Sequence, residues 1–245
     1  MKEKPLSLMT FNFAKDYRKK TMTVQDTMQL AAQVEIPCLD VMRVGAKEVP
    51  EYRRAMAATG VRVHCFISCI SFFAREEAIR AALDREMAVA QSLDARLFMI
   101  VPYYMIIDNR KAKKLGRERV LEQMAAGFRL AVERGKQYGL GVCFETPPAE
   151  EIHLSGTEDC RWVLEQVPGL GLVFDTANML PHGDRTLEAC EALKKFIVHV
   201  HLKDVALVQA RRSFFPDERA ADGRKMQATV FGQGGIPVKE VYDRM

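Results

Sequence analysis

Short apolar runs alternate with longer amphipathic runs along this chain, and this alternation restricts the fold more than any other feature. Seven short runs are mostly apolar, as expected for parallel strands that are buried on both faces. They are Leu6–Phe11, Cys38–Met42, Val61–Ser68, Arg96–Pro102, Leu140–Glu145, Leu170–Asp175 and Phe196–Leu202. The clearest helical runs, Glu76–Leu93 and Arg117–Tyr138, have apolar residues at steps of three and four. This order predicts a parallel α/β fold.

Signals at the ends of the helical runs support this division. Thr23 and Thr157 each precede a helical run and are followed by acidic residues, so we expect both to begin helices. Another helix is expected from Pro237. The connections Tyr103–Gly116 and Val205–Ile236 are long, and we interpret them as loops that carry binding groups.

The chain length favours one particular α/β architecture. Its 245 residues are close to the ~250 of a (β/α)₈ TIM barrel. An open doubly wound sheet is the alternative, but no glycine-rich dinucleotide-binding sequence follows the first strand, which continues Phe11-Asn-Phe-Ala-Lys-Asp. We therefore predict a single TIM-barrel domain over residues 1–245, with seven parallel strands and without the eighth strand and helix.

The composition limits the classes of partner. The chain has 36 basic and 32 acidic residues, and a net charge of +4 is too small to indicate nucleic-acid binding. No apolar run has the length of a signal peptide or a membrane span, and the six cysteines show no CxxC spacing. We expect a cytoplasmic protein with reduced thiols, whose partner is a small molecule rather than nucleic acid or a membrane.

Three consecutive strands end in a residue that can bind metal. The fifth strand ends in Glu145, the sixth in Asp175 and the seventh in His201. Because side chains alternate along a strand, these three can share one side of the sheet while Phe144 and Phe174 lie under the helices on the other. In a TIM barrel the active site lies at these carboxyl ends of the strands.

Two buried carboxylates beside an imidazole are costly unless a cation lies among them. Glu145, Asp175 and His201 offer oxygen and nitrogen donors suited to one divalent ion, Mn²⁺, Co²⁺, Mg²⁺ or Zn²⁺. In the alternative, each carboxylate pairs with a nearby Lys or Arg and the histidine belongs to the core. For a single residue we favour that alternative, but for all three at matching strand ends we favour the metal site.

Three segments around these residues resemble motifs of a known superfamily. They are Cys143-Phe-Glu145-Thr-Pro, Val173-Phe-Asp175-Thr-Ala-Asn178 and His199-Val-His201-Leu-Lys-Asp204. They look like the sugar phosphate isomerase/epimerase superfamily of xylose isomerase-like TIM barrels, which includes ketose 3-epimerases, hydroxypyruvate isomerase, inosose dehydratase and endonuclease IV. Gly232-Gln-Gly-Gly-Ile-Pro resembles its glycine motif before the last helix. The resemblance spans nearly the whole chain.

The resemblance implies roles for five residues. One divalent ion would be bound by Glu145, Asp175 and His201, and Glu145 would also act as acid or base. Asn178 and Lys203 would bind the substrate, although ketose epimerases often have histidine where Asn178 stands.

A fourth metal ligand of the superfamily has no counterpart in this sequence. It is a glutamate at the end of strand eight, whereas the sequence ends at Met245 and Glu240 falls on the preceding helix. We expect weak metal binding and little epimerase activity from these 245 residues, and recovery of both in a version extended through a strand that ends in Glu.

The resemblance implies a divalent-metal-dependent isomerase or epimerase of sugars or sugar phosphates, which transfers a proton next to a carbonyl through a metal-bound enediolate. A lyase like inosose dehydratase shares the first step and remains an alternative, as does a degenerate barrel without catalysis. An endonuclease IV-like phosphodiesterase is disfavoured, because it needs several metals with many histidine ligands and this chain has five histidines.

Two basic segments have less specific interpretations. Residues 111–119 could receive a phosphate, but we favour a solvated loop and helix start. Residues 211–225, with Phe214 and Phe215, suit either a substrate lid or a contact in a homo-oligomer. Four further residues are interpreted as core or as support for the site: His64, Cys65, Cys69 and His199.

Overall fold

The structure is a computed structural model that describes all residues except 1–4, 103–105, 149–152 and 211–217. The chain forms two compact units, which are described separately. Unit 1 consists of Met1–Ser68, Glu76–Ile100 and Ala131–Val142, and unit 2 of Cys69–Arg75, Val101–Leu130 and Cys143–Met245.

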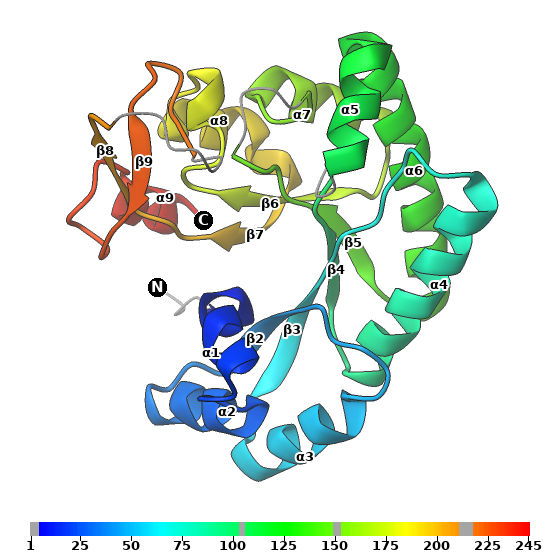
Figure 1. Cartoon of the computed structure of the whole chain (residues 1–245), viewed down its shortest axis with the longest axis vertical. Coiled ribbons are helices and arrows are strands. Elements are labelled where there is room, and N and C mark those ends of the chain that lie inside the picture. The colour runs from blue at the N-terminus through cyan, green and yellow to red at the C-terminus, as the bar shows by residue number, and fades with distance from the viewer. Residues whose placement is uncertain (1–4, 103–105, 149–152, 211–217) are drawn as a thin grey trace. The chain divides into compact units, whose positions relative to one another are not determined.

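Unit 1 contains four parallel strands in the order β1-β2-β3-β4 (Figure 1). They are β1 (Ser7–Met9), β2 (Cys38–Met42), β3 (Arg62–Ser68) and β4 (Leu97–Ile100). The helices of this unit are the 3₁₀ helix η1 (Thr10–Phe13), α1 (Ala14–Lys19), α2 (Val24–Gln33), α3 (Val49–Thr59) and α4 (Glu76–Ser92). Leu39, Phe66 and Phe98 are buried in these strands, which explains their apolar composition.

Unit 2 contains the parallel strands β5-β6-β7 and a separate antiparallel hairpin, β8-β9 (Figure 1). These strands are β5 (Gly141–Phe144, of which Gly141 and Val142 belong to unit 1), β6 (Gly171–Asp175), β7 (Ile197–His201), β8 (Val205–Val208) and β9 (Lys225–Ala228). The helices are α5 (Ile106–Leu115), α6 (Arg117–Tyr138, whose last eight residues belong to unit 1), α7 (Thr157–Gln166), η2 (Leu180–His182), α8 (Thr186–Leu193), η3 (Lys194–Phe196) and α9 (Val238–Arg244).

Three aromatic rings attach α6 to β5. The Phe128 ring lies 4.9 Å from the ring of Phe72 and 4.9 Å from the ring of Phe144. Gly127 allows this packing, because a Cβ atom there would meet the Phe72 ring at 2.2 Å. Phe144 therefore faces the helices, as the alternation of side chains predicted, and Glu145 follows on the opposite side of the strand.

The strands and most of the helices were predicted correctly. Over residues 5–102, 106–148, 153–210 and 218–245 the parallel strands number seven, and each lies within one of the expected runs. Both loop predictions were wrong in part, since Tyr103–Gly116 contains α5 and Val205–Ile236 contains the β8-β9 hairpin. The interpretation of residues 1–245 as one domain stays a prediction.

The helix starts at Thr23 and Thr157 were both predicted correctly, although only Thr23 acts as a cap residue. Thr23 and Asp26 form a capping box, in which the Asp26 N–H donates to Thr23 Oγ1 (3.1 Å) and the Thr23 N–H donates to Asp26 Oδ2 (2.8 Å). Thr157 does not cap α7, because it is the first helical residue and Gly156 holds the cap position. Its N–H donates instead to Asp184 Oδ2 at 2.9 Å, a carboxylate that the chain supplies from 27 residues away.

Among the described residues, no helix is both long enough and apolar enough to cross a membrane.

Candidate metal centre

Three neighbouring strand ends in unit 2 bring Glu145, Asp175 and His201 together. Asp175 lies opposite His201 in the parallel pairing of β6 with β7, and Glu145 directly follows β5, which pairs with β6. One donor atom from each residue lies within 4.8 Å of the other two. All three residues are buried, so their charges are poorly solvated.

A hydrogen bond of 2.6 Å joins His201 Nδ1 to Glu145 Oε1. A carboxylate can only accept, so the imidazole N–H is the donor and the bond fixes the orientation of the ring. In this tautomer Nε2 is the nitrogen suited to an ion, and Glu145 has a second oxygen for the same purpose.

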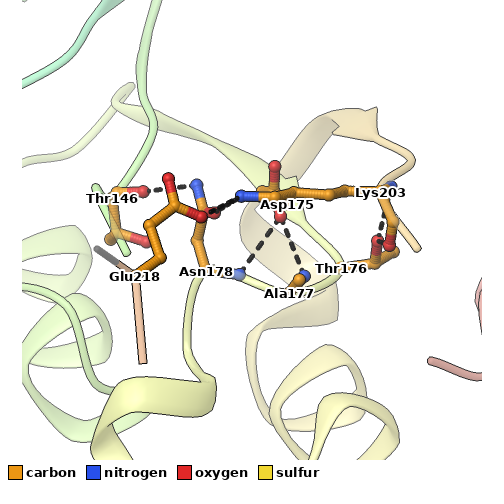
Figure 2. A network of polar contacts seen from close by, with 7 residues as sticks. All are labelled: Thr146, Asp175, Thr176, Ala177, Asn178, Lys203 and Glu218. Atoms are coloured by element: carbon orange, nitrogen blue, oxygen red, sulfur yellow. Dashed lines mark hydrogen bonds and ion pairs between the residues drawn. The ribbon is translucent and has the colours of Figure 1, made fainter. Parts of the chain in front are cut away.

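Backbone groups fix one oxygen of Asp175. Its Oδ1 accepts hydrogen bonds from the N–H groups of Ala177 (2.8 Å) and Asn178 (3.1 Å), so its orientation does not depend on a ligand (Figure 2). Burial, and then the negative charge of Glu145, raises the pKa of Asp175 to about 6. The carboxylate is thus held close to a second carboxylate at an electrostatic cost that a cation would remove.

The donor set fits a divalent ion. Two carboxylate oxygens and an imidazole nitrogen within 4.8 Å of one another can all reach a shared ion at about 2.0–2.2 Å. Oxygen and nitrogen donors without thiolate suit Mn²⁺, Co²⁺, Mg²⁺ or Zn²⁺. The assignment of these three residues as metal ligands stays a prediction, which the short distances between their donor atoms support.

Asn178 and Lys203 form a polar network beside these residues (Figure 2). Asn178 Nδ2 donates to the Thr146 carbonyl (2.8 Å), and Asn178 Oδ1 accepts from Lys203 Nζ (3.2 Å). Lys203 Nζ also donates to Glu218 Oε2 at 3.0 Å. Burial alone would lower the pKa of Lys203, but the charges of Asp175, Glu218 and Glu145 outweigh it and raise that pKa. Lys203 is therefore a fixed positive charge next to the carboxylates.

The Thr176 hydroxyl connects the ends of β6 and β7. It accepts from the Lys203 N–H (2.8 Å) and donates to the Lys203 carbonyl (2.7 Å), in a buried position. We expect Thr176→Val to lower the free energy of unfolding by about 1–2 kcal/mol, because both Lys203 backbone groups lose their partner while the side-chain shape is kept. Urea unfolding checks this, with Thr176→Ser as the control that retains the hydroxyl. Equal stability of the two variants would contradict the expectation.

Asp204, which directly follows Lys203, organises the glycine segment. Its Oδ2 accepts from the N–H groups of Gly232 (2.8 Å) and Gly234 (3.0 Å), and its Oδ1 accepts from that of Ile236 (3.2 Å). Glycine is needed at 234 because a Cβ atom would lie 2.0 Å from Asp204 Oδ1, and Gly232 has a positive φ of 82°. The glycine segment therefore wraps a buried carboxylate.

A family model described as a xylose isomerase-like TIM barrel matches residues 24–245. The chain belongs to this family. Its seven parallel strands are those of a TIM barrel without an eighth barrel strand in the described part of the chain, as the sequence predicted. A search of curated proteins gave no match.

Several solved structures resemble the chain over most of its length. A probable 3-DHS dehydratase, AsbF from Bacillus anthracis, is 17% identical with a TM-score of 0.72, and the match covers 98% of this chain and 88% of that one. The IolI protein with a bound zinc atom is 14% identical with a TM-score of 0.74, covering 98% and 83%. The 3-keto-D-glucoside 4-epimerase YcjR from E. coli is 11% identical with a TM-score of 0.66, covering 90% and 81%. At these identities the likeness shows the fold.

His199 lies beside this centre, since its ring is 5.4 Å from the His201 ring. The two basic segments singled out in the sequence make other contacts or fall outside the described residues. Residues 111–119 belong to α5 and the start of α6, where the basic side chains are exposed. Arg219 and Arg224 bond within their own turn, to Gly223 and Asp222. Arg211, Arg212, Phe214 and Phe215 fall outside the described residues. The sequence reasoning missed Glu218, whose contact with Lys203 has no short-range signal because 15 residues separate them.

Proposed function

We propose that this chain is a divalent-metal-dependent isomerase or epimerase of a sugar, sugar phosphate or related keto compound. The observation that carries the proposal is the convergence of Glu145, Asp175 and His201 donor atoms within 4.8 Å at three neighbouring strand ends. Membership in the xylose isomerase-like family and the relatives named as epimerase and dehydratase support it. The IolI protein, whose structure contains a bound zinc atom, supports a divalent metal.

Each residue has a role in this proposal. Glu145, Asp175 and His201 hold the ion, which supplies Lewis-acid polarisation of a carbonyl and its adjacent hydroxyl. The Glu145 carboxylate takes the proton from the carbon next to the carbonyl and returns it to the substrate. Asn178 has a second N–H besides the one bonded to Thr146, and we assign it to a substrate hydroxyl. Lys203 supplies positive charge to a substrate oxygen.

The first step, removal of the proton from the carbon next to the carbonyl, allows a direct test of the proposed function. After a calorimetric titration with Mn²⁺, Co²⁺, Mg²⁺ and Zn²⁺, ketoses and inososes are incubated with the loaded protein in D₂O and followed by NMR. We expect deuterium to enter at the carbon next to the carbonyl, because proton removal needs Glu145 alone. The assay also distinguishes an isomerase from a dehydratase, because a dehydratase loses water from the substrate after the proton has been removed. Absence of binding for all four metals would rule the proposal out.

A further inference from the structure

Lys203 Nζ donates to two acceptors that differ in how firmly they are held (Figure 2). The first is Asn178 Oδ1, a neutral acceptor in a buried amide that is anchored to the Thr146 carbonyl. The second is the Glu218 carboxylate, whose side chain is 46% exposed, whereas the Lys203 side chain is 25% exposed. The lysine is thus fixed in place, and its outer partner can rotate into solvent.

The backbone at Glu218 is ordered independently of its side chain. The Glu218 carbonyl accepts from the N–H of Met226 in β9 at 2.9 Å, and the Ala220 N–H donates to the Arg224 carbonyl at 3.0 Å. The carboxylate can therefore leave Lys203 by side-chain rotation, without unfolding the turn. Breaking this ion pair costs little on the Glu218 side, because water solvates the released carboxylate.

The charges near Lys203 indicate which kind of ligand group can replace the Glu218 carboxylate as the partner of Lys203 Nζ. A divalent ion held by Glu145 and Asp175 would neutralise both carboxylates, so the half-buried ammonium would then depend on Glu218 as its counter-charge. A neutral hydroxyl cannot replace that charge, whereas an anionic group can replace it without loss.

We propose that the substrate of this site carries an anionic group, a carboxylate or a phosphate, which displaces the Glu218 carboxylate from Lys203 Nζ. The proposal rests on the proposed function and adds the substrate class to it. Glu218 is the specificity-determining residue: it occupies the anion subsite in the absence of substrate and competes weakly with it. Substrates that lack an anion leave the Glu218–Lys203 pair intact and gain nothing from Lys203.

Matched probes test this proposal by calorimetry on the full chain, with and without a divalent metal. Gluconate is compared with glucitol, and ribose 5-phosphate with ribose. We expect at least one anionic probe to bind about tenfold more tightly than its neutral partner, because of the charge-assisted bond to Lys203. A preference for gluconate alone identifies a carboxylate subsite, and one for ribose 5-phosphate alone identifies a phosphate subsite. Equal binding of charged and neutral probes overturns the proposal.

Two variants test whether the Lys203–Glu218 pair is responsible for the preference for anionic probes. Glu218→Gln should strengthen anion binding about fivefold by removing a competing charge, and Lys203→Met should abolish the preference. Glu165→Gln is the control. Glu165 is 48% exposed and forms a 3.6 Å ion pair with Lys195, and neither residue belongs to the site, so this variant should bind the probes as the parent protein does. A Glu218→Gln variant that binds anions no better, or that loses deuterium exchange, overturns the proposal. Failure of metal binding would instead refute the proposed function, and the metal-free comparison would still test the anion subsite.

Discussion

Replacement of Glu145 by glutamine should abolish proton exchange at the carbon next to the substrate carbonyl while leaving the fold intact. The variant loses a metal ligand and the proton acceptor, and losing a general acid or base costs about 10²–10⁴ in rate. Glutamine keeps the volume and an oxygen for the hydrogen bond that His201 Nδ1 makes at 2.6 Å. It also removes the negative charge that, after burial, raises the pKa of Asp175, so the metal-free variant should be at least as stable as the parent protein.

Deuterium exchange, calorimetric metal titration and thermal unfolding together check this expectation. We expect exchange to fall below detection, metal affinity to drop by ~10² and the melting temperature of the metal-free protein to hold or rise. Glu240→Gln is the control, because Glu240 lies exposed on α9 and should change none of the three measurements. Exchange that survives in Glu145→Gln would show that another group removes the proton.

The fold could be predicted from the sequence because its parallel strands are buried on both faces. Runs such as Leu170–Asp175 are apolar for that reason, and α6 occupies the predicted range Arg117–Tyr138 because its apolar residues recur with helical spacing. The β8-β9 hairpin was missed because its strands are only four residues each, and β9, which reads Lys-Met-Gln-Ala, lacks the apolar run that β8 has. The hydrogen bond from the Thr157 N–H to Asp184 could not be predicted, because Asp184 lies 27 residues away in the sequence.

The candidate site was partly predictable for a related reason. Parallel strands align their carboxyl ends, so three ligand-type residues at consecutive strand ends can be expected to meet. The contacts that tune the site come from distant segments and leave no periodic signal. Examples are Glu218 on Lys203 and the glycine segment around Asp204, which begins 28 residues later. The sequence could suggest donors, but the way each donor is held required the structure.

Replacement of Asp175 by asparagine should stabilise the metal-free protein at neutral pH. The pKa of Asp175 is about 6 in the folded chain against an ordinary value of 3.8, so the folded state binds the proton more tightly than the unfolded state. Asp175 therefore contributes a loss of roughly 2–3 kcal/mol to the stability of the metal-free protein as the pH rises from about 4 to about 6. Asparagine removes this penalty, and its Oδ1 can still accept from Ala177 and Asn178.

Urea unfolding of the EDTA-treated proteins between pH 4 and 8 measures the effect. We expect the parent protein to lose stability across pH 4–6, and Asp175→Asn to lack that loss and to exceed the parent by roughly 2–3 kcal/mol at pH 7. Asp204→Asn is the matched control: both Asp204 oxygens accept backbone N–H groups, so an amide would place an NH₂ against a donor and lower stability by about 2 kcal/mol. Metal at a thousand times Kd should reverse the order of parent and Asp175→Asn, because binding to the folded state then adds about 4.1 kcal/mol and only the parent retains the ligand. A destabilised Asp175→Asn in EDTA, or an order that metal leaves unchanged, would show that Asp175 is a structural residue rather than a ligand.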